Sequence, residues 1–112
     1  MSRRICFALD LVDDAELIAA YEAAHAPGAV WPEVIAGIRA KGFLDMEIWR
    51  VNDRLFMIAE VSDAWPLPLD SSRAEVDGRW ESAMDPFQRP LRGADEGEKW
   101  RPMQRIFAMD EQ

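Results

Sequence analysis

The chain contains one histidine, His25, and one tyrosine, Tyr21. An imidazole titrates near neutrality, so His25 is the candidate for any acid–base step. Leu17, Tyr21 and His25 are spaced by four residues, which places them on one face of a helix. The dipole at the C-terminal end of that helix favours a protonated imidazole at His25. The spacing therefore predicts an acid and a hydroxyl donor side by side at the lip of an apolar cavity, an arrangement that could transfer protons.

Five tryptophans accompany this pair, more than a small core usually needs: Trp31, Trp49, Trp65, Trp80 and Trp100. Tryptophan rings also pack against the C–H faces of sugars while polar neighbours bind the hydroxyl groups. A histidine and a tyrosine on one helix face can equally be structural and satisfy only each other. The residues alone leave two interpretations open: a proton-transfer site beside an aromatic platform, and a non-catalytic module that binds a small molecule.

Charge and cysteine content exclude several classes of function. The net charge of -8 argues against nucleic acid or an anionic membrane as a partner, because both favour clustered Lys and Arg. The single Cys6 excludes an internal disulfide, and no Cys/His cluster predicts a metal site. The chain contains neither a phosphate-binding loop nor a nucleophile elbow, so no motif predicts a cofactor or a covalent mechanism. With no apolar run of membrane-spanning length and no secretory signal, we expect a cytoplasmic protein.

Three carboxylates on predicted strands, Asp45, Glu47 and Glu60, are further candidates for the site. A carboxylate that faces a covered sheet needs a partner, so each could be an acid of the pocket or could support one. The acidic pairs Asp13-Asp14 and Asp95-Glu96 instead suggest a helix cap and a solvated loop.

Hydrophobic periodicity and turn residues predict the elements that position these side chains. Asp13 and Glu16 form a capping pair for a helix that ends near His25, before Pro27-Gly28, and Ser72 with Glu75 forms a second capping pair. The expected elements are a strand over 4–9, that first helix, a helix from Trp31-Pro32 to Gly42, a hairpin of strands over 43–51 and 55–61, a helix carrying Val76, Trp80, Met84 and Phe87, a loop over 88–99, and a last strand over 100–109.

This order predicts one α+β domain over residues 1–112 with the ferredoxin-like arrangement βαββαβ. Both faces of the hairpin carry large apolar residues, among them Met46, Trp49, Met57 and Ile58. The helices cover one face of the sheet, and the chain has no further helix for the other. We therefore expect a homodimer in which two sheets pack face to face.

Several segments resemble the L-rhamnose mutarotase family, including its relatives assigned to L-fucose. They are Tyr21-Glu22-Ala23-Ala24-His25, Trp31-Pro32-Glu33-Val34, Arg79-Trp80-Glu81-Ser82-Ala83-Met84, and the closing stretch from Glu98-Lys99-Trp100 to Ile106-Phe107. The resemblance covers nearly the whole chain in the order of the family.

The resemblance implies a dimeric α+β barrel with a sugar pocket in each protomer. It implies interconversion of the α and β anomers of a 6-deoxyhexose, L-fucose or L-rhamnose, without metal or cofactor. His25 matches the proton donor of the family, and Tyr21 and Trp80 match positions that contact the sugar. General acid–base catalysis of this kind raises the reaction rate by about 10²–10⁴-fold. Trp31 is a further candidate for the ring face, and Met46 or Met84 for the wall against the 6-methyl group.

The chain departs from the pattern of the family at three places. The interval from His25 to Trp31 is longer than the corresponding interval in the family, and it contains Pro27-Gly28. Met46 stands where the rhamnose enzymes have a tyrosine, and Glu81 where they have a second tryptophan. These changes favour L-fucose or a related sugar, and they add Glu81 to the candidate substrate-binding residues. The rival enzymatic interpretation is a cofactor-free monooxygenase of the dimeric α+β barrel type, which could also use one histidine beside aromatic rings.

Overall fold

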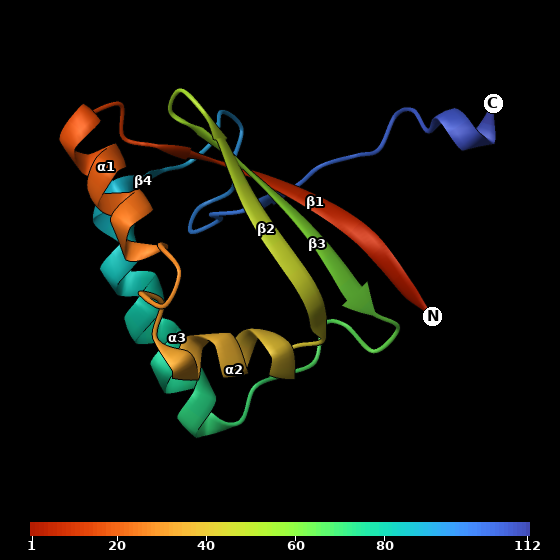
Figure 1. Cartoon of the computed structure of the whole chain (residues 1–112), viewed down its shortest axis with the longest axis horizontal. Helices are drawn as coiled ribbons and strands as arrows, with labels where there is room; N and C mark the ends of the chain where they lie inside the picture. The colour runs from red at the N-terminus through yellow and green to blue at the C-terminus, as the bar shows by residue number, and fades with distance from the viewer.

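The computed structural model describes residues 1–112, the whole chain. Three helices lie along one side of an antiparallel sheet, and the C-terminal segment leads away from it (Figure 1). No helix is both long enough and apolar enough to cross a membrane. In chain order the elements are β1 (Ser2–Leu11), α1 (Ala15–Ala24), α2 (Pro32–Ala40), β2 (Phe43–Val51), β3 (Arg54–Ser62), α3 (Ser71–Met84), a 3-10 turn η1 (Asp85–Phe87), β4 (Gln88–Arg89), β5 (Arg101–Pro102) and a 3-10 turn η2 (Met109–Glu111).

The sheet has the strand order β2-β3-β1-β4, with β5 also paired to β1. All of these pairings are antiparallel, and the order is that of a ferredoxin-like fold. The α+β class and the arrangement expected from the sequence are therefore confirmed. The hairpin is confirmed as well: Asn52 adopts a left-handed φ of 51°, the conformation that a tight turn between β2 and β3 requires.

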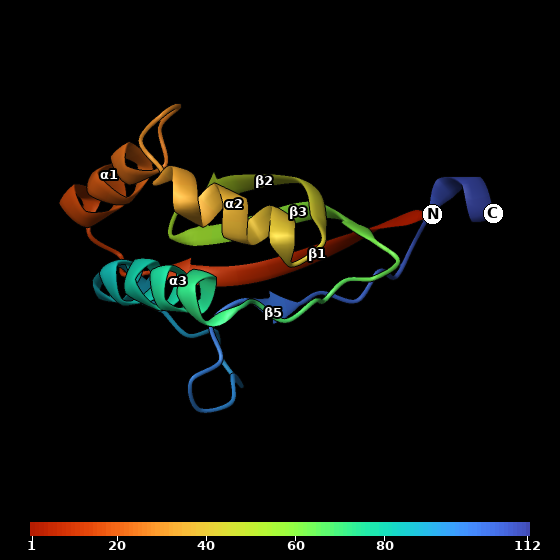
Figure 2. The same ribbon diagram turned by 90° about the horizontal axis from the view of Figure 1, so that it is seen from below.

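The two faces of the sheet differ in cover. On β3 the residues that face the helices are all buried: Leu55, Met57, Ala59 and Val61. Figure 2 shows α2 in front of β2 and β3, with α3 beside it. The opposite face, which we call the open face, carries the alternate residues Phe56 and Ile58 of β3 and Trp49 of β2, and nothing in the chain covers Trp49. Alternation along the strands thus places large apolar side chains on both faces, and the helices bury only one.

Both predicted capping pairs are wrong, because a carboxylate nearby caps each helix instead. The N-cap of α1 is Asp14, which accepts from the backbone N–H of Leu17, and not Asp13. The N-cap of α3 is Asp70, whose carboxylate accepts from the backbone N–H of Arg73 and from the Ser72 hydroxyl. A charged acceptor makes a stronger hydrogen bond than a hydroxyl, so Ser72 supports the cap without forming it.

The last strand and the loop before it also differ from expectation. Gln88 and Arg89 form β4, inside the segment expected to be loop, and the long last strand is reduced to β5. Both pieces pair with β1, so the loop between them interrupts one edge strand. After the Met103 N–H donates to the Cys6 carbonyl (2.8 Å), the chain leaves the sheet. The tail exposes three large apolar side chains, Ile106, Phe107 and Met109.

Candidate functional site

A cavity of about 370 Å³ lies between the helices and the covered face of the sheet. Thirteen of its 18 lining residues are hydrophobic, and the polar ones are His25, Lys41, Asp77, Glu81 and Gln88. A mostly apolar cleft with a few converging polar groups is the usual form of a small-molecule site, and about 300 Å³ is the lower end of the usual size. The cavity therefore fits a ligand of monosaccharide size.

His25 stands at the point where α1 ends. Its backbone N–H donates to the Glu22 carbonyl (3.1 Å), and its Nδ1 donates to the Tyr21 carbonyl (2.7 Å). Both bonds satisfy carbonyls that the end of a helix leaves without partners. A carbonyl can only accept, so Nδ1 carries a proton and Nε2 is the nitrogen left for a ligand. The cap thus selects one tautomer of the neutral ring, in which Nε2 is the base.

Tyr21 lies directly beside the imidazole, with ring centroids 4.3 Å apart. Its side chain is buried among the residues of the core, and its ring also packs edge-on against Phe87. Burial raises the pKa of the Tyr21 phenol, while a hydrogen bond from Gln88 opposes the rise. The phenol therefore keeps its proton at neutral pH and can donate a hydrogen bond into the cavity.

Trp80 of α3 forms the aromatic wall next to His25, with ring centroids 5.5 Å apart in an edge-on arrangement. It lines the cavity together with Trp100, which follows the loop that interrupts the edge strand. Trp31 packs edge-on against Trp80 at 5.1 Å but does not line the cavity. The structure thus brings Trp80 to the predicted place and leaves Trp31 outside it, as a support for the Trp80 ring.

Glu81 lines the cavity one residue after Trp80 and is held by Lys99. The Lys99 ammonium donates to the Glu81 carboxylate (3.0 Å) and to its backbone carbonyl (2.9 Å), and it also pairs with Asp85. Burial lowers the pKa of Lys99, but its hydrogen bonds to Asp85 and Glu81 outweigh burial, so the pKa lies above the usual value. Lys99 therefore stays charged and fixes the carboxylate of Glu81 at the cavity.

Two methionines complete the predicted set. Met46 of β2 and Met84 of α3 both line the cavity, as an apolar wall would require. The candidate carboxylates Asp45, Glu47 and Glu60 do not line it. In the register of β2 and β3, Glu47 pairs with Ile58 on the open face, so strand alternation turns its side chain away from the site.

Sequence reasoning missed several polar residues of the cavity. Lys41 and Asp77 line it and form an ion pair of 3.2 Å between the end of α2 and α3. Gln88 lines it from β4, and Lys99 controls Glu81 from the loop. These residues come from four separate segments without a common spacing, so only the folded chain brings them together.

Comparison with known proteins shows which family the chain belongs to. The sequence model described as L-rhamnose mutarotase matches residues 4–109. An L-fucose mutarotase of Xanthomonas campestris pv. campestris is 45% identical over 112 residues, covering 97% of this chain and 90% of that protein. A UPF0734 protein of Dictyostelium discoideum is 31% identical over 110 residues, covering 92% of this chain and 86% of that protein.

A solved structure shows the same fold. The crystal structure of an L-rhamnose mutarotase from Formosa agariphila superposes with a TM-score of 0.67 at 20% identity, covering 96% of this chain and 98% of that chain. The family match extends over nearly the whole sequence, and the resemblance expected from the sequence is confirmed. The chain therefore belongs to the L-rhamnose mutarotase family and is a sugar mutarotase, an isomerase that acts on carbohydrates.

Proposed function

We propose that this protein interconverts the α and β anomers of a 6-deoxyhexose, with L-fucose as the preferred sugar. The observation that carries the proposal is His25: its Nδ1 is bound to the Tyr21 carbonyl, and its Nε2 is free beside a buried phenol in a cavity of about 370 Å³. Ring opening of a pyranose requires a general base and a hydrogen-bond donor, and the anchored imidazole and the neutral phenol beside it can supply both.

The reaction moves one proton between two oxygens. In a pyranose, the anomeric oxygen O1 and the ring oxygen O5 are both bonded to C1, so a single imidazole nitrogen can reach both. Nε2 of His25 takes the proton from O1 as the C1–O5 bond breaks and the C1 carbonyl forms. The electron pair of the broken bond goes to O5, and the Tyr21 hydroxyl stabilises it with a hydrogen bond until the imidazolium returns the proton. After rotation about C1–C2, the reverse steps close the ring on the other face.

The remaining residues of the set hold the sugar. Trp80 offers its ring to the C–H face of the pyranose, and Trp31 acts through Trp80. The carboxylate of Glu81, fixed by Lys99, accepts a hydrogen bond from a sugar hydroxyl. Met46 and Met84 form the apolar wall for the 6-methyl group.

Two observations support L-fucose over L-rhamnose. The relative with 45% identity is named L-fucose mutarotase. In addition, the family resemblance implies aromatic residues in the rhamnose enzymes at the positions of Met46 and Glu81, and both of these residues line the cavity here. An aromatic ring replaced by a carboxylate changes which sugar hydroxyls find an acceptor.

The test is exchange spectroscopy by NMR on L-fucose, L-rhamnose and a set of D-hexoses. We expect the protein to accelerate anomer exchange of L-fucose most, L-rhamnose less, and the D-hexoses least. Wild-type protein that leaves the exchange rate of every sugar at its spontaneous value would overturn the proposal. A preference for L-rhamnose would overturn the choice of L-fucose alone.

The role of His25 is tested with His25→Asn. The asparagine amide can still donate to the Tyr21 carbonyl at the end of α1, but it cannot take a proton from the sugar. We expect the catalysed exchange rate to fall by about 10²–10⁴-fold while the fold and sugar binding are kept. A folded variant with unchanged exchange would instead leave a binding role for His25.

The protein also works as a homodimer in this proposal, with the open faces of two sheets packed together. Trp49 is 60% exposed on that face, and its partner on β3 is Phe56, with Ile58 on the same face of that strand. The tail adds Ile106 and Phe107, which find no cover within the chain. Sedimentation equilibrium should therefore give twice the mass of the 12.8 kDa chain. A monomeric mass at micromolar protein concentration would contradict the proposed homodimer.

We place its activity in the cytoplasm, with a monosaccharide and a second copy as its partners. The single cysteine, Cys6, is free, which suits a reducing compartment. The net charge of -8 gives no attraction to nucleic acid or to an anionic lipid surface. Cell fractionation with activity measured in each fraction tests the location.

A further inference from the structure

Gln88 contains a buried polar atom without a partner. Its Oε1 is the one buried side-chain oxygen or nitrogen in the chain that makes no hydrogen bond. A buried acceptor without a partner destabilises the folded state, so such atoms are rare and call for an explanation. Gln88 also lines the cavity, and its other amide atom, Nε2, lies 3.5 Å from the Tyr21 hydroxyl.

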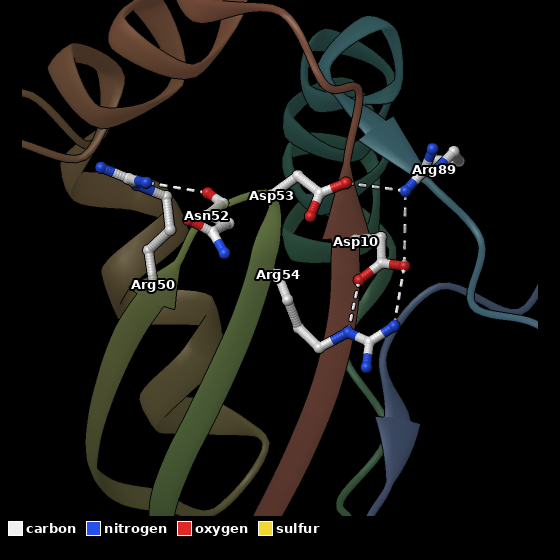
Figure 3. Close-up of polar contacts among 6 residues, drawn as sticks. All are labelled: Asp10, Arg50, Asn52, Asp53, Arg54 and Arg89. Atoms are coloured by element: carbon white, nitrogen blue, oxygen red, sulfur yellow. Dashed lines mark hydrogen bonds and ion pairs between the residues drawn. The ribbon is translucent and has the colours of Figure 1, made fainter.

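The backbone of β4 fixes the direction of this side chain. Gln88 pairs with Leu11, and Arg89 pairs with Asp10, so the two residues of β4 point to opposite faces of the sheet. Arg89 donates to Asp53 (2.8 Å) and lies 3.7 Å from Asp10, which also accepts two hydrogen bonds from Arg54 (2.7 and 3.2 Å; Figure 3). This cluster of charges ties β4 to β1 and to the hairpin turn on the open face. Gln88 is thereby held against the cavity.

The polarity of the amide determines which way the phenol donates. An N–H of Gln88 that reaches the Tyr21 oxygen uses that oxygen as an acceptor. The Tyr21 proton then has no protein acceptor, since the phenol makes no other hydrogen bond. The distance of 3.5 Å is long for a hydrogen bond, and catalytic hydrogen bonds often shorten when the substrate binds.

We propose that Gln88 is a positioning residue of the site: its Nε2 donates to the Tyr21 hydroxyl, its Oε1 accepts a hydroxyl of the bound sugar, and the Tyr21 proton therefore points to the ring oxygen. This inference rests on the proposed mutarotase function and deepens it. The sugar supplies the missing partner of Oε1. Gln88 then binds the substrate and also sets the donor direction of the phenol beside His25.

The first test replaces the amide. Gln88→Met keeps the length of the side chain without polar atoms, and Gln88→Glu keeps its shape but has no N–H when ionised. The ionised carboxylate of Gln88→Glu accepts the Tyr21 proton and turns it away from the sugar. We expect kcat for anomer exchange to fall about tenfold or more in both variants, which corresponds to about 1.4 kcal/mol in the activation free energy. Gln104→Met, at an exposed position of the tail, is the matched control and should keep the wild-type rate.

A second readout needs no sugar. Because Tyr21 is the one tyrosine, its phenol can be titrated alone by NMR of protein labelled with ¹³C at the tyrosine ζ carbon. Without the hydrogen bond from Gln88, burial is less opposed, so the Tyr21 pKa should rise further in Gln88→Met. If the wild type failed to accelerate any sugar, the proposed function would be wrong, yet this titration would still test the contact between Gln88 and Tyr21.

A double-mutant cycle separates positioning from packing. If Gln88 acts through the phenol, Gln88→Met should lower kcat in the wild type but have little further effect on kcat in Tyr21→Phe. A loss of the same size in both backgrounds would overturn the positioning role, and so would an unchanged Tyr21 titration in Gln88→Met. Gln88→Glu with wild-type kcat would also overturn it, because a role in shape alone predicts that result.

Discussion

The two faces of the sheet carry similar residues but lead to different consequences. On β3, Leu55 faces the helices and is buried, whereas Ile58, three residues later, faces the other way and is 36% exposed. The helices cover the first face incompletely, and the space left over is the cavity with His25 and Tyr21. The open face has no such cover, and we propose that a second copy completes it. The alternation along the strands thus places apolar side chains on both faces. The position of the helices determines which of these side chains form the core and which line the cavity.

Charges also differ between the faces. On the open face, Asp10 is buried and bound by Arg54, with Arg89 close by, so its charge is compensated within the protein (Figure 3). On the cavity side, Glu81 and Gln88 keep polar atoms available to a ligand. One cluster therefore serves to fix the ends of β1, β3 and β4, while the other groups are arranged around a cavity.

The largest expected effect on stability comes from Leu55→Ala. The side chain is part of the core cluster, so its removal leaves a cavity, and we expect a loss of about 2–5 kcal/mol in the free energy of unfolding. Ile58→Ala on the same strand is the matched control and should cost clearly less at protein concentrations below the dissociation constant of the proposed dimer. Urea unfolding at low protein concentration measures both. Equal losses would contradict the difference in cover between the faces.

A smaller effect is expected from Trp49→Ser on the open face. Exposed aromatic residues at the centre of an interface are frequent hot spots, so the dissociation constant of the proposed dimer should rise at least about tenfold. The stability of the monomer should hardly change, because Trp49 makes one side-chain hydrogen bond, a contact of 3.3 Å to Glu47. Sedimentation velocity across a dilution series measures the association. Leu67→Ser, in the loop after β3, serves as the control; an effect as large as that of Trp49→Ser would argue against the open face as the interface.

Local patterns predicted much of the fold. Period-two alternation and the Asn52 turn indicated the hairpin, and Pro32 and Pro27-Gly28 indicated the bounds of the first two helices. The cap of α1 was wrong by one residue because β1 extends further than expected. The Val12 N–H donates to the Phe87 carbonyl (2.8 Å), which holds the chain extended past the end of the strand and delays the helix. A contact between residues so far apart in the sequence leaves no local signal.

The prediction of the last strand failed for a related reason. The prediction was a strand over residues 100–109, but only Arg101 and Pro102 pair with β1. Pro102 has no N–H to donate, and the apolar residues beyond it need cover that this chain does not provide. For the site, the spacing of Tyr21 and His25 on one helix was sufficient to bring them together. Gln88, Lys99 and Lys41 could not be found, because their relation to the cavity depends on sheet register and on a loop.

The smallest effect we expect is a loss of stability at alkaline pH that arises from Tyr21, on the covered side of the sheet. Burial raises the pKa of Tyr21 above the value of about 10 for an exposed phenol, so the unfolded chain loses this proton first as the pH rises. The contribution to stability is complete below about pH 10 and disappears as the pH rises through the pKa of the folded state. In Tyr21→Phe the free energy of unfolding should fall less steeply as the pH rises. The fall that remains comes from Lys99, because burial lowers its pKa but the hydrogen bonds to Asp85 and Glu81 raise it above the usual value. Urea unfolding over an alkaline pH series measures the difference. Identical slopes in the two proteins would mean that the phenol is as well solvated in the fold as in the unfolded chain, and a hydroxyl in that state could not serve as the shielded donor beside His25.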